Sequence, residues 1–277
     1  MPLSANLLAS GPGWRVSDVV CTSGPRDPCY VEQHSAYSIA LVTNGNFQYR
    51  TVQGSALMTP GSLLLGNQGA CYECGHQHGS GDRCLAFHFS PEIFESVVAA
   101  VPGRGRLALA APRLPPVPSV LALLATAQAL RDEGGEREQF RELGLQLAGA
   151  VCSALNETSA SSRSPTLRDE RRVAEALRRI EAQRGARISI DELASDAAVS
   201  LFHFLRIFEQ VVGVTPGQYM LRTRLRRAAV RLRRSSEAIA AVALDCGFDD
   251  LSTFNRQFRR ATGLTPGAFR AQRASLT

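Results

Sequence analysis

The densest group of reactive side chains in the sequence lies between residues 71 and 88. Three of the seven cysteines and three of the five histidines fall in this stretch. Thiolate and imidazole groups together favour Zn²⁺ or a similar transition metal over hard cations. In an extended chain, alternate side chains project on one face, and the glycines at 79 and 81 allow the chain to turn back. We therefore expect Zn²⁺ or another transition metal to be held by Cys74, His76, His78 and Cys84.

Two other interpretations of this cluster stay open. The thiols of Cys71, Cys74 and Cys84 could form a redox switch. Alternatively, the cysteines are small core residues and the histidines lie at the surface. The spacing of the cluster is not that of a standard zinc finger, so it does not decide between these interpretations and a metal site.

A second group of functional residues lies near the C-terminus, where one sequence unit occurs twice. Residues 208–219 read FEQVVGVTPGQY and residues 258–269 read FRRATGLTPGAF, and their shared Phe, Gly, Thr and Pro positions are 50 residues apart. Such a spaced match indicates a duplicated unit. In each copy the Gly is expected to end one helix, and the Thr-Pro pair is expected to cap and begin the next.

Each copy predicts two short helices joined by a tight turn. In the first copy, residues 189–192 fit a capping box, and Ser200 caps a second helix over 201–212. In the second copy, a helix from about residue 236 leads to a turn at 246–248 and to another helix that ends near residue 261. This pattern is typical of a helix-turn-helix, whose second helix enters the major groove of DNA.

The outward faces of these second helices supply the residues that we expect to contact double-stranded DNA. Arginine suits guanine edges or phosphates, and asparagine suits adenine. Phe202 and Leu205 in the first copy would instead contact thymine methyl groups or position the backbone. The predicted DNA-binding residues are Ser200, Phe202, His203, Leu205, Arg206, Leu251, Ser252, Asn255 and Arg256.

The charge of the chain changes near a polar, Ser-rich segment at 156–165. Residues 1–164 contain 11 Arg and 13 acidic residues, a net charge of −2, whereas residues 165–277 contain 20 Arg and 12 acidic residues, a net charge of +8. The chain has no Lys, so every basic side chain is Arg. A basic half of this kind is typical of a nucleic-acid partner. The segment itself reads as a linker.

The N-terminal half shows short strand patterns separated by turn residues. Runs at 37–42 and 47–52 flank Asn44-Gly45-Asn46, which predicts a hairpin, and Pro60-Gly61 introduces a further strand. Many short strands with such turns suggest a small barrel or sandwich. From residue 118 to 155 the periodicity becomes helical, which predicts either helices that cover the barrel or a dimerisation segment.

With these motifs in place, residues 170–273 resemble the DNA-binding domain of the arabinose-regulator (AraC/XylS) family. The resemblance rests on the paired G-[VL]-T-P-G-x-[YF] ends, on Cys-Gly-Phe-Asp-Asp at 246–250 and on Thr-Phe-Asn-Arg-Gln-Phe at 253–258. It implies two helix-turn-helix motifs that are bridged by one helix and read successive major grooves. Residues 14–90 are similar, more distantly, to the cupin-type barrel that senses an effector in this family.

The expected fold is α+β with two domains. We predict a cupin-like, effector- or metal-sensing β-barrel with helices at 1–112, a helical cover or dimerisation segment at 113–157, a linker at 158–168, and an all-α domain with two helix-turn-helix motifs bridged by one helix at 169–277. The predicted function is sequence-specific regulation of transcription, as an activator, in the cytoplasm. No apolar run approaches the roughly 20 residues of a membrane span, and the N-terminus lacks the pattern of a signal peptide.

The expected partners are promoter or operator DNA, a small effector or metal ion, a second copy of the chain and, for an activator, RNA polymerase. We expect neither a membrane partner nor enzymatic activity. The alternative functions are a cupin-type metalloenzyme and a DNA-repair regulator with a reactive metal-bound cysteine. Metal content and substrate turnover would separate these alternatives from a regulator.

Overall fold

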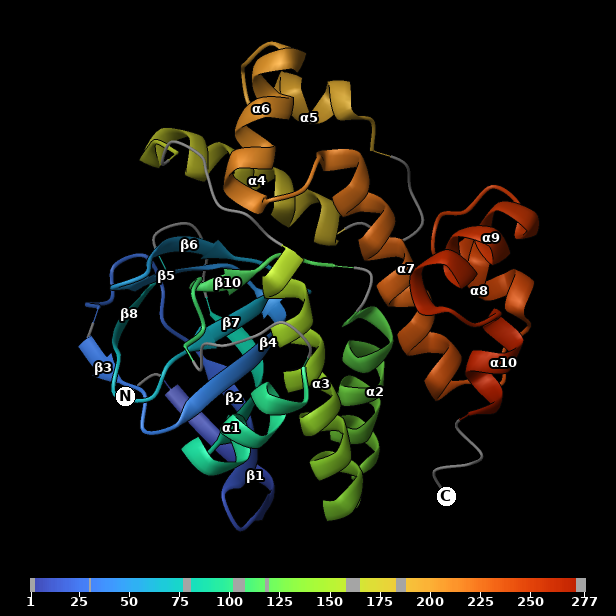
Figure 1. The fold of residues 1–277 in the computed structure, drawn as a ribbon. Coiled ribbons are helices and arrows are strands. Elements are labelled where there is room, and N and C mark those ends of the chain that lie inside the picture. Colours follow the sequence, from blue (N-terminus) through green and yellow to red (C-terminus); the bar gives the residue numbers. More distant parts are fainter. Residues whose placement is uncertain are drawn as a thin grey trace. The chain divides into compact units, whose positions relative to one another are not determined.

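Strands fill the first part of the chain and helices fill the second (Figure 1). The computed structural model describes residues 3–29, 31–76, 81–101, 108–117, 120–157, 165–182 and 188–272. The chain divides into one unit of Met1–Pro115 with Leu130–Ser164 and another of Pro116–Ala129 with Pro165–Thr277. The prediction of N-terminal sheets and a C-terminal helical part is confirmed. The segment 113–157 contributes residues to both units.

The first unit is built on two antiparallel sheets. One sheet has the strand order β1-β2-β9-β4-β7-β10 and the other has the order β3-β8-β5-β6. The strands are β1 (Leu3–Gly11), β2 (Trp14–Cys21), β3 (Val31–Gln33), β4 (Tyr37–Gly45), β5 (Phe47–Thr51), β6 (Gly54–Met58), β7 (Leu63–Gly66), β8 (Cys71–Gly75), β9 (Asp82–Phe89) and β10 (Arg113–Leu114).

Strand β9 shows how alternation along a strand builds this unit. Cys84 and Ala86 share a buried cluster with residues of the other sheet, including Phe47 of β5. Phe87 lies on the opposite face of β9, where a Cβ on Gly144 would come within 3.1 Å of its ring. Helices α1 (Pro91–Ala100) and α3 (Arg137–Glu157) pack against each other, and α3 also contacts β1. Helix α3 therefore packs on this unit.

The predicted hairpin at Asn44-Gly45-Asn46 is wrong in its pairing, although both flanking strands exist. Strand β4 pairs with β7 and β9, whereas β5 pairs with β6 and β8, so the chain crosses from one sheet to the other. Gly45 has φ +78, and a Cβ there would lie 2.2 Å from the backbone oxygen of Gly81. The glycine is needed for this close approach and for a left-handed backbone, rather than for a two-residue turn.

The second unit is helical, and several of its helix ends lie where local signals predicted, although the helix expected from about residue 236 begins at Ile239. Ser189 forms a complete capping box, and Thr215 caps the helix that begins at Pro216. Gly213 and Gly263 end their helices with φ of 83° and 78°. The helices are α4 (Leu167–Ala182), α5 (Ile190–Asp196), α6 (Leu201–Val212), α7 (Pro216–Arg234), α8 (Ile239–Asp245), α9 (Leu251–Thr262) and α10 (Pro266–Ala271).

Helix α2 (Leu121–Glu133) begins in the second unit and ends in the first. Near its start, Leu121 and Ala125 belong to the buried cluster that also contains Leu225 of α7 and Phe254 and Phe258 of α9. The core of the second helix-turn-helix copy is thus completed by a segment that precedes the Ser-rich linker. Among the helices that the structure describes, none is long and apolar enough to cross a membrane.

Candidate nucleic-acid interface

Two helix-turn-helix copies lie in the second unit, one formed by α5 and α6 and the other by α8 and α9. Their turns are closed by equivalent backbone hydrogen bonds, from Val199 N to Ala194 O (3.2 Å) and from Phe248 N to Ala243 O (3.1 Å). The second turn uses Gly247 with φ 88°, while the first uses Ala198 with φ 51°. The predicted duplication is therefore present in the backbone as well as in the sequence.

The inner faces of α6 and α9 pack in the same way. Phe208 of α6 is buried and contacts the ring of Tyr219 at 5.9 Å, and Phe258 of α9 contacts Phe269 at 5.3 Å. In α6, Phe204, Ile207, Phe208 and Val211 form a buried stripe. In α9, Phe254 and Phe258 are buried, and Ala261 is half-buried.

The outer face of α9 presents polar side chains at the start of the helix. Asp250 caps the helix by accepting a hydrogen bond from Thr253 N at 2.7 Å. Leu251, Ser252, Asn255 and Arg256, which were predicted to contact DNA, are all exposed. The N-terminal half of a recognition helix is the part that reaches base edges, so this placement suits direct readout.

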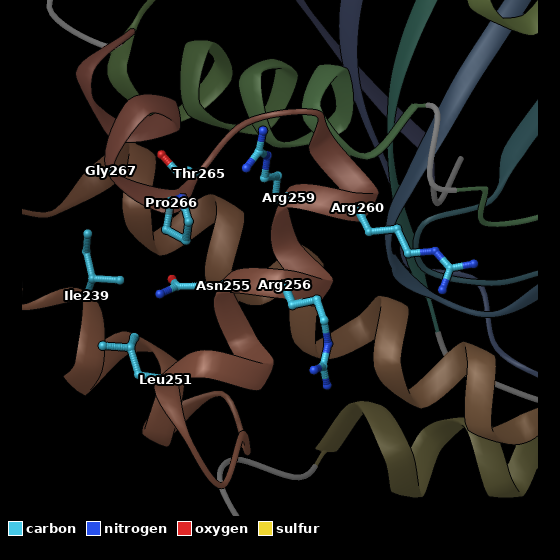
Figure 2. Close-up of a pocket in the computed structure, with 9 residues that line it drawn as sticks. All are labelled: Ile239, Leu251, Asn255, Arg256, Arg259, Arg260, Thr265, Pro266 and Gly267. Carbon is cyan, nitrogen blue, oxygen red and sulfur yellow. The ribbon is translucent and has the colours of Figure 1, made fainter.

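The sequence prediction did not include Arg259 and Arg260, which extend the same face. Both are exposed, and with Asn255 and Arg256 they line an open groove that continues to Thr265 at the start of α10. Figure 2 shows the three arginine side chains leaving α9 in different directions, with Asn255 between Leu251 and Pro266. Within the part of the chain that the structure describes, none of the three arginines donates a hydrogen bond to another residue. Their spacing of three and four from Asn255 and Arg256 was the signal that could have found them.

The outer face of α6 has a different chemistry. The Ser200 hydroxyl caps the helix by accepting from His203 N at 3.3 Å. The His203 ring lies 3.1 Å from the Arg206 guanidinium through Nδ1 and 3.8 Å from Asp169 of α4 through Nε2. Leu205 is half-buried and Arg206 is exposed. Phe202 lies on this helix, but its side chain falls outside the described residues.

The two outer faces therefore differ in charge. The positions of Arg259 and Arg260 in α9 correspond, 50 residues earlier, to Glu209 and Gln210 in α6. Helix α9 can bind phosphates and read bases, because it carries three arginines and an asparagine. Among the described side chains on the outer face of α6, Arg206 is exposed and Leu205 is half-buried, so we expect this helix to make fewer polar contacts than α9.

Most arginines of the connecting helix α7 are used inside the protein. Arg226 is buried and contacts both carboxylate oxygens of Glu181 at 2.9 and 2.8 Å. Arg231 pairs with acidic residues near α8, and Arg233 stacks over the Phe269 ring at 4.2 Å. These three arginines therefore hold neighbouring helices in place.

The cysteine and histidine cluster of the first unit is only partly brought together. Cys74, His76 and Cys84 line one cavity of about 280 Å³ between the two sheets. His78 lies outside the described residues. The structure adds Cys21 and Asp82 to the group, since His76 Nε2 lies 2.6 Å from Asp82 Oδ1 and Cys84 Sγ lies 3.4 Å from Asp82 Oδ2.

Burial sets the charge state of several groups in this cavity. It raises the pKa of the Cys74 and Cys84 thiols, so both are neutral at pH 7 when nothing else binds them. Burial also lowers the pKa of His34 and His88 to about 4, which keeps both imidazoles neutral. His34 in turn hydrogen-bonds Tyr49 Oη at 2.8 Å. The cavity wall therefore combines the neutral side chains of Cys74, Cys84, His34 and His88 and several aromatic rings with the carboxylates of Asp27, Glu32 and Asp82.

Comparisons with known proteins match the helical unit. Residues 193–272 fit a family model described as a helix-turn-helix domain. The chain is 40% identical over 81 residues to an HTH-type transcriptional regulator of Mycobacterium tuberculosis, a match that covers 29% of this chain and 31% of that protein. It is 38% identical over 88 residues to the probable transcription factor PqrA of Proteus vulgaris, covering 32% of this chain and 72% of that protein.

A solved structure is similar over part of the chain. It is a transcriptional regulator from Chromobacterium violaceum described by its AraC-type DNA-binding domain, with 35% identity and a TM-score of 0.35. That match covers 37% of this chain and 92% of the other. This chain therefore spans about a third of the length of the Mycobacterium relative, and nearly all of the shorter structure.

Proposed function

The chain belongs to the AraC-type family of helix-turn-helix transcription factors, and on this premise we propose that it is a sequence-specific DNA-binding regulator of transcription. The relatives named above are transcription regulators, which favours a role without catalysis. The two helix-turn-helix copies would occupy successive major grooves of one DNA site.

The observation that carries this proposal is the outer face of α9. Asn255 and Arg256 are adjacent, exposed and near the N-terminal half of a helix whose other face is anchored by buried Phe254 and Phe258. The rigid inner face fixes the direction of the outer side chains, which bidentate recognition of a base pair requires. Arg259 and Arg260 lie one turn further along, where they suit phosphate contacts.

The experiment is selection of binding sites from random duplexes by the full-length chain, followed by titration of the selected site and a scrambled duplex. A specific regulator should bind the selected site at least about 1,000-fold more tightly than the scrambled one at physiological salt. The affinity should also fall steeply with salt, because bound arginines release counterions from phosphates. No enriched sequence, or equal affinity for both duplexes, would overturn the proposal.

Arg256→Ala separates base readout from phosphate binding. We expect a loss of about 1–3 kcal/mol on the selected site and a relaxed preference at one base position. Arg260→Ala is the matched control on the same helix, and it should weaken binding to both duplexes by similar factors. If Arg256→Ala also weakens both duplexes equally, Arg256 contacts a phosphate.

The proposal extends to the first unit, as the domain that senses an effector. Support comes from the cavity between its two sheets, whose wall combines apolar side chains with a few polar groups, as ligand sites commonly do. A cupin-like identity for this unit, pairing with a second copy of the chain and contact with RNA polymerase as an activator are parts of the same proposal, and they rest on the family resemblance. Titration of DNA binding with candidate effectors tests the sensing role.

A further inference from the structure

The cavity of the first unit contains potential metal ligands that DNA binding does not use. Cys21 ends β2, His76 follows β8 and Asp82 begins β9. One ligand atom from each residue lies within 4.8 Å of those of the other two. Cys21 and His76 are buried, and the side chain of Asp82 is only 7% exposed. The group is therefore enclosed, unlike the carboxylate clusters that are common on protein surfaces.

Strand register holds this group in place. Cys21 and Asp82 are direct partners in the antiparallel pairing of β2 with β9. Cys84 lies two residues further along β9, and therefore on the same face as Asp82. Its Sγ atom is 3.4 Å from Asp82 Oδ2, and Cys84 is buried. His76 reaches the group from the end of β8, in the other sheet, where its ring also packs on Phe47 at 5.9 Å.

The backbone at this corner is tightly constrained. Gly81 has φ +70, and a Cβ there would lie 2.8 Å from the carbonyl oxygen of Cys21. Its amide donates a hydrogen bond to Ser23 O at 2.8 Å. A left-handed residue packed against a neighbouring carbonyl requires glycine. The backbone where the end of β2 meets the start of β9 is therefore fixed, and so are the positions from which Cys21 and Asp82 extend. A metal site needs this kind of preorganisation.

We propose that Cys21, His76, Asp82 and Cys84 form a binding site for one thiophilic divalent ion of the Zn²⁺ type. Two sulfurs, one imidazole nitrogen and one carboxylate oxygen form a donor set that suits Zn²⁺ and excludes Ca²⁺ or Mg²⁺. Ligand atoms about 2.0–2.3 Å from a tetrahedral ion lie roughly 3.3–3.8 Å from one another. Asp82 lies 2.6 Å from His76 Nε2 and 3.4 Å from Cys84 Sγ, and the ligand atoms of Cys21, His76 and Asp82 all lie within 4.8 Å of one another. These distances bracket the range that a tetrahedral ion requires.

Binding would replace the contact between His76 and Asp82 with bonds to the ion. The two thiols would each lose their S–H proton to solvent as the S–metal bonds form, so uptake would release protons. The ion would join the ends of β2 and β9 in one sheet to the end of β8 in the other. This donor set shares His76 and Cys84 with the one predicted from sequence, and it has Cys21 and Asp82 in place of Cys74 and His78.

The ion is also a candidate for the effector, and that step alone rests on the proposed DNA-binding function. Metal binding itself is measured without DNA, so a protein that binds Zn²⁺ but no DNA would overturn only the proposed function. A protein that binds a selected DNA site but no metal would overturn only the inference made here.

The test uses untagged full-length protein, Zn²⁺ titration and Co²⁺ as a spectroscopic probe. We expect about one Zn²⁺ per chain, and with Co²⁺ a thiolate-to-cobalt charge-transfer band together with the d–d bands of a tetrahedral ion. Cys21→Ser and Asp82→Asn should each weaken Zn²⁺ binding by at least about 100-fold, more than the loss of a typical outer-shell partner. Cys71→Ser is the matched control, because Cys71 is exposed on β8 and does not line the cavity.

Cys74→Ser distinguishes the two ligand sets, because Cys74 lines the cavity but is absent from the proposed one. The Cys74→Ser variant should bind Zn²⁺ as tightly as the unmodified chain does. Loss of Zn²⁺ in Cys74→Ser with retention in Cys21→Ser would overturn the proposed ligands. If the variants fail to fold, the Co²⁺ spectrum of the unmodified chain still tests the proposal. The absence of a thiolate-to-cobalt band would overturn it, because His76 and Asp82 would then be no more than a hydrogen-bonded pair.

Discussion

Replacing Glu181 with Gln should destabilise the helical unit by about 2–4 kcal/mol. Glu181 lies at the C-terminal end of α4 and binds Arg226 of α7 through both carboxylate oxygens. The side chains of Arg226 and Glu181 are 9% and 21% exposed. Removing one partner of a buried pair costs about 3–5 kcal/mol, and the partial exposure of Glu181 places the expected loss at the lower end. Glutamine keeps an oxygen that can accept from Tyr219 Oη and Thr223 Oγ1, so the loss measures the missing charge.

The assay is urea unfolding of the full chain, followed by two signals. Far-UV circular dichroism reports the helices, whereas fluorescence reports the single tryptophan, Trp14, which is buried in β2 of the first unit. Glu181→Gln should shift the dichroism transition to lower urea. It should leave the fluorescence transition in place, because every partner of Glu181 lies in the second unit.

The control is Glu175→Gln, an exposed position on the same helix, for which we expect a change within about 0.5 kcal/mol. The double variant Glu181→Gln with Arg226→Met should cost less than the sum of the single changes, because it leaves no unpaired buried charge. A Glu181→Gln variant as stable as Glu175→Gln would refute the assignment of this pair as the link between α4 and α7.

Three further changes test other parts of the structure. Ala198→Gly should stabilise the helical unit by about 0.5–1 kcal/mol, because relief of the left-handed alanine outweighs the added entropy of the unfolded chain. Gly247→Ala should instead destabilise it by about 1–2 kcal/mol. Both changes in the free energy of unfolding are measured by urea unfolding, and two changes of the same sign would contradict the assigned turns. Leu121→Ala should lower the free energy of unfolding by about 2–4 kcal/mol in the same assay, because Leu121 is buried. Leu167→Ala, at an exposed position, should lower it by less than about 0.5 kcal/mol. Equal losses would contradict the place of α2 in the core of the second helix-turn-helix copy. The folded-state pKa of His34 is lowered to about 4, so the unfolded chain binds more protons than the folded chain below pH 6.5. The stability of the first unit, followed by Trp14 fluorescence, should therefore fall from pH 6.5 toward pH 4. His34→Gln should reduce this dependence of stability on pH, and an unchanged dependence would contradict the assignment of His34 as a buried, neutral imidazole.

The helical unit could be predicted largely from sequence because its signals are local. The capping box at Ser189 and the Thr215 cap each join residues three positions apart. Gly213 and Gly263 end helices through a backbone conformation that their own residue type favours. Once these boundaries are set, the helical period places Phe208 inward and Asn255 outward, so the exposed face of α9 follows with little further information.

The parts that sequence could not supply depend on contacts between distant residues. Asn44-Gly45 is a hairpin signal in isolation, and only the approach of Gly81 shows why glycine is there. Cys21 and Asp82 become neighbours because β2 pairs with β9, a register that no local pattern specifies. Likewise, the arginines of α7 look like a solvated or DNA-binding face until Glu181, 45 positions before Arg226, is placed beside it.

The two copies of the helix-turn-helix are alike inside and different outside, and this difference bears on how DNA would be read. The inner faces share Phe208 and Phe258 because each must fill an equivalent core, whereas nothing in the fold restricts the outer positions. Helix α9 carries arginines at 259 and 260, where α6 carries Glu209 and Gln210. An acidic side chain near phosphates weakens binding, so base discrimination should be concentrated in the half-site that α9 occupies. The first copy, which contains α6, would then read few bases and would contribute mainly by holding a fixed position on the DNA backbone. The ion pair between Glu181 of α4 and Arg226 of α7 gains importance for this reason.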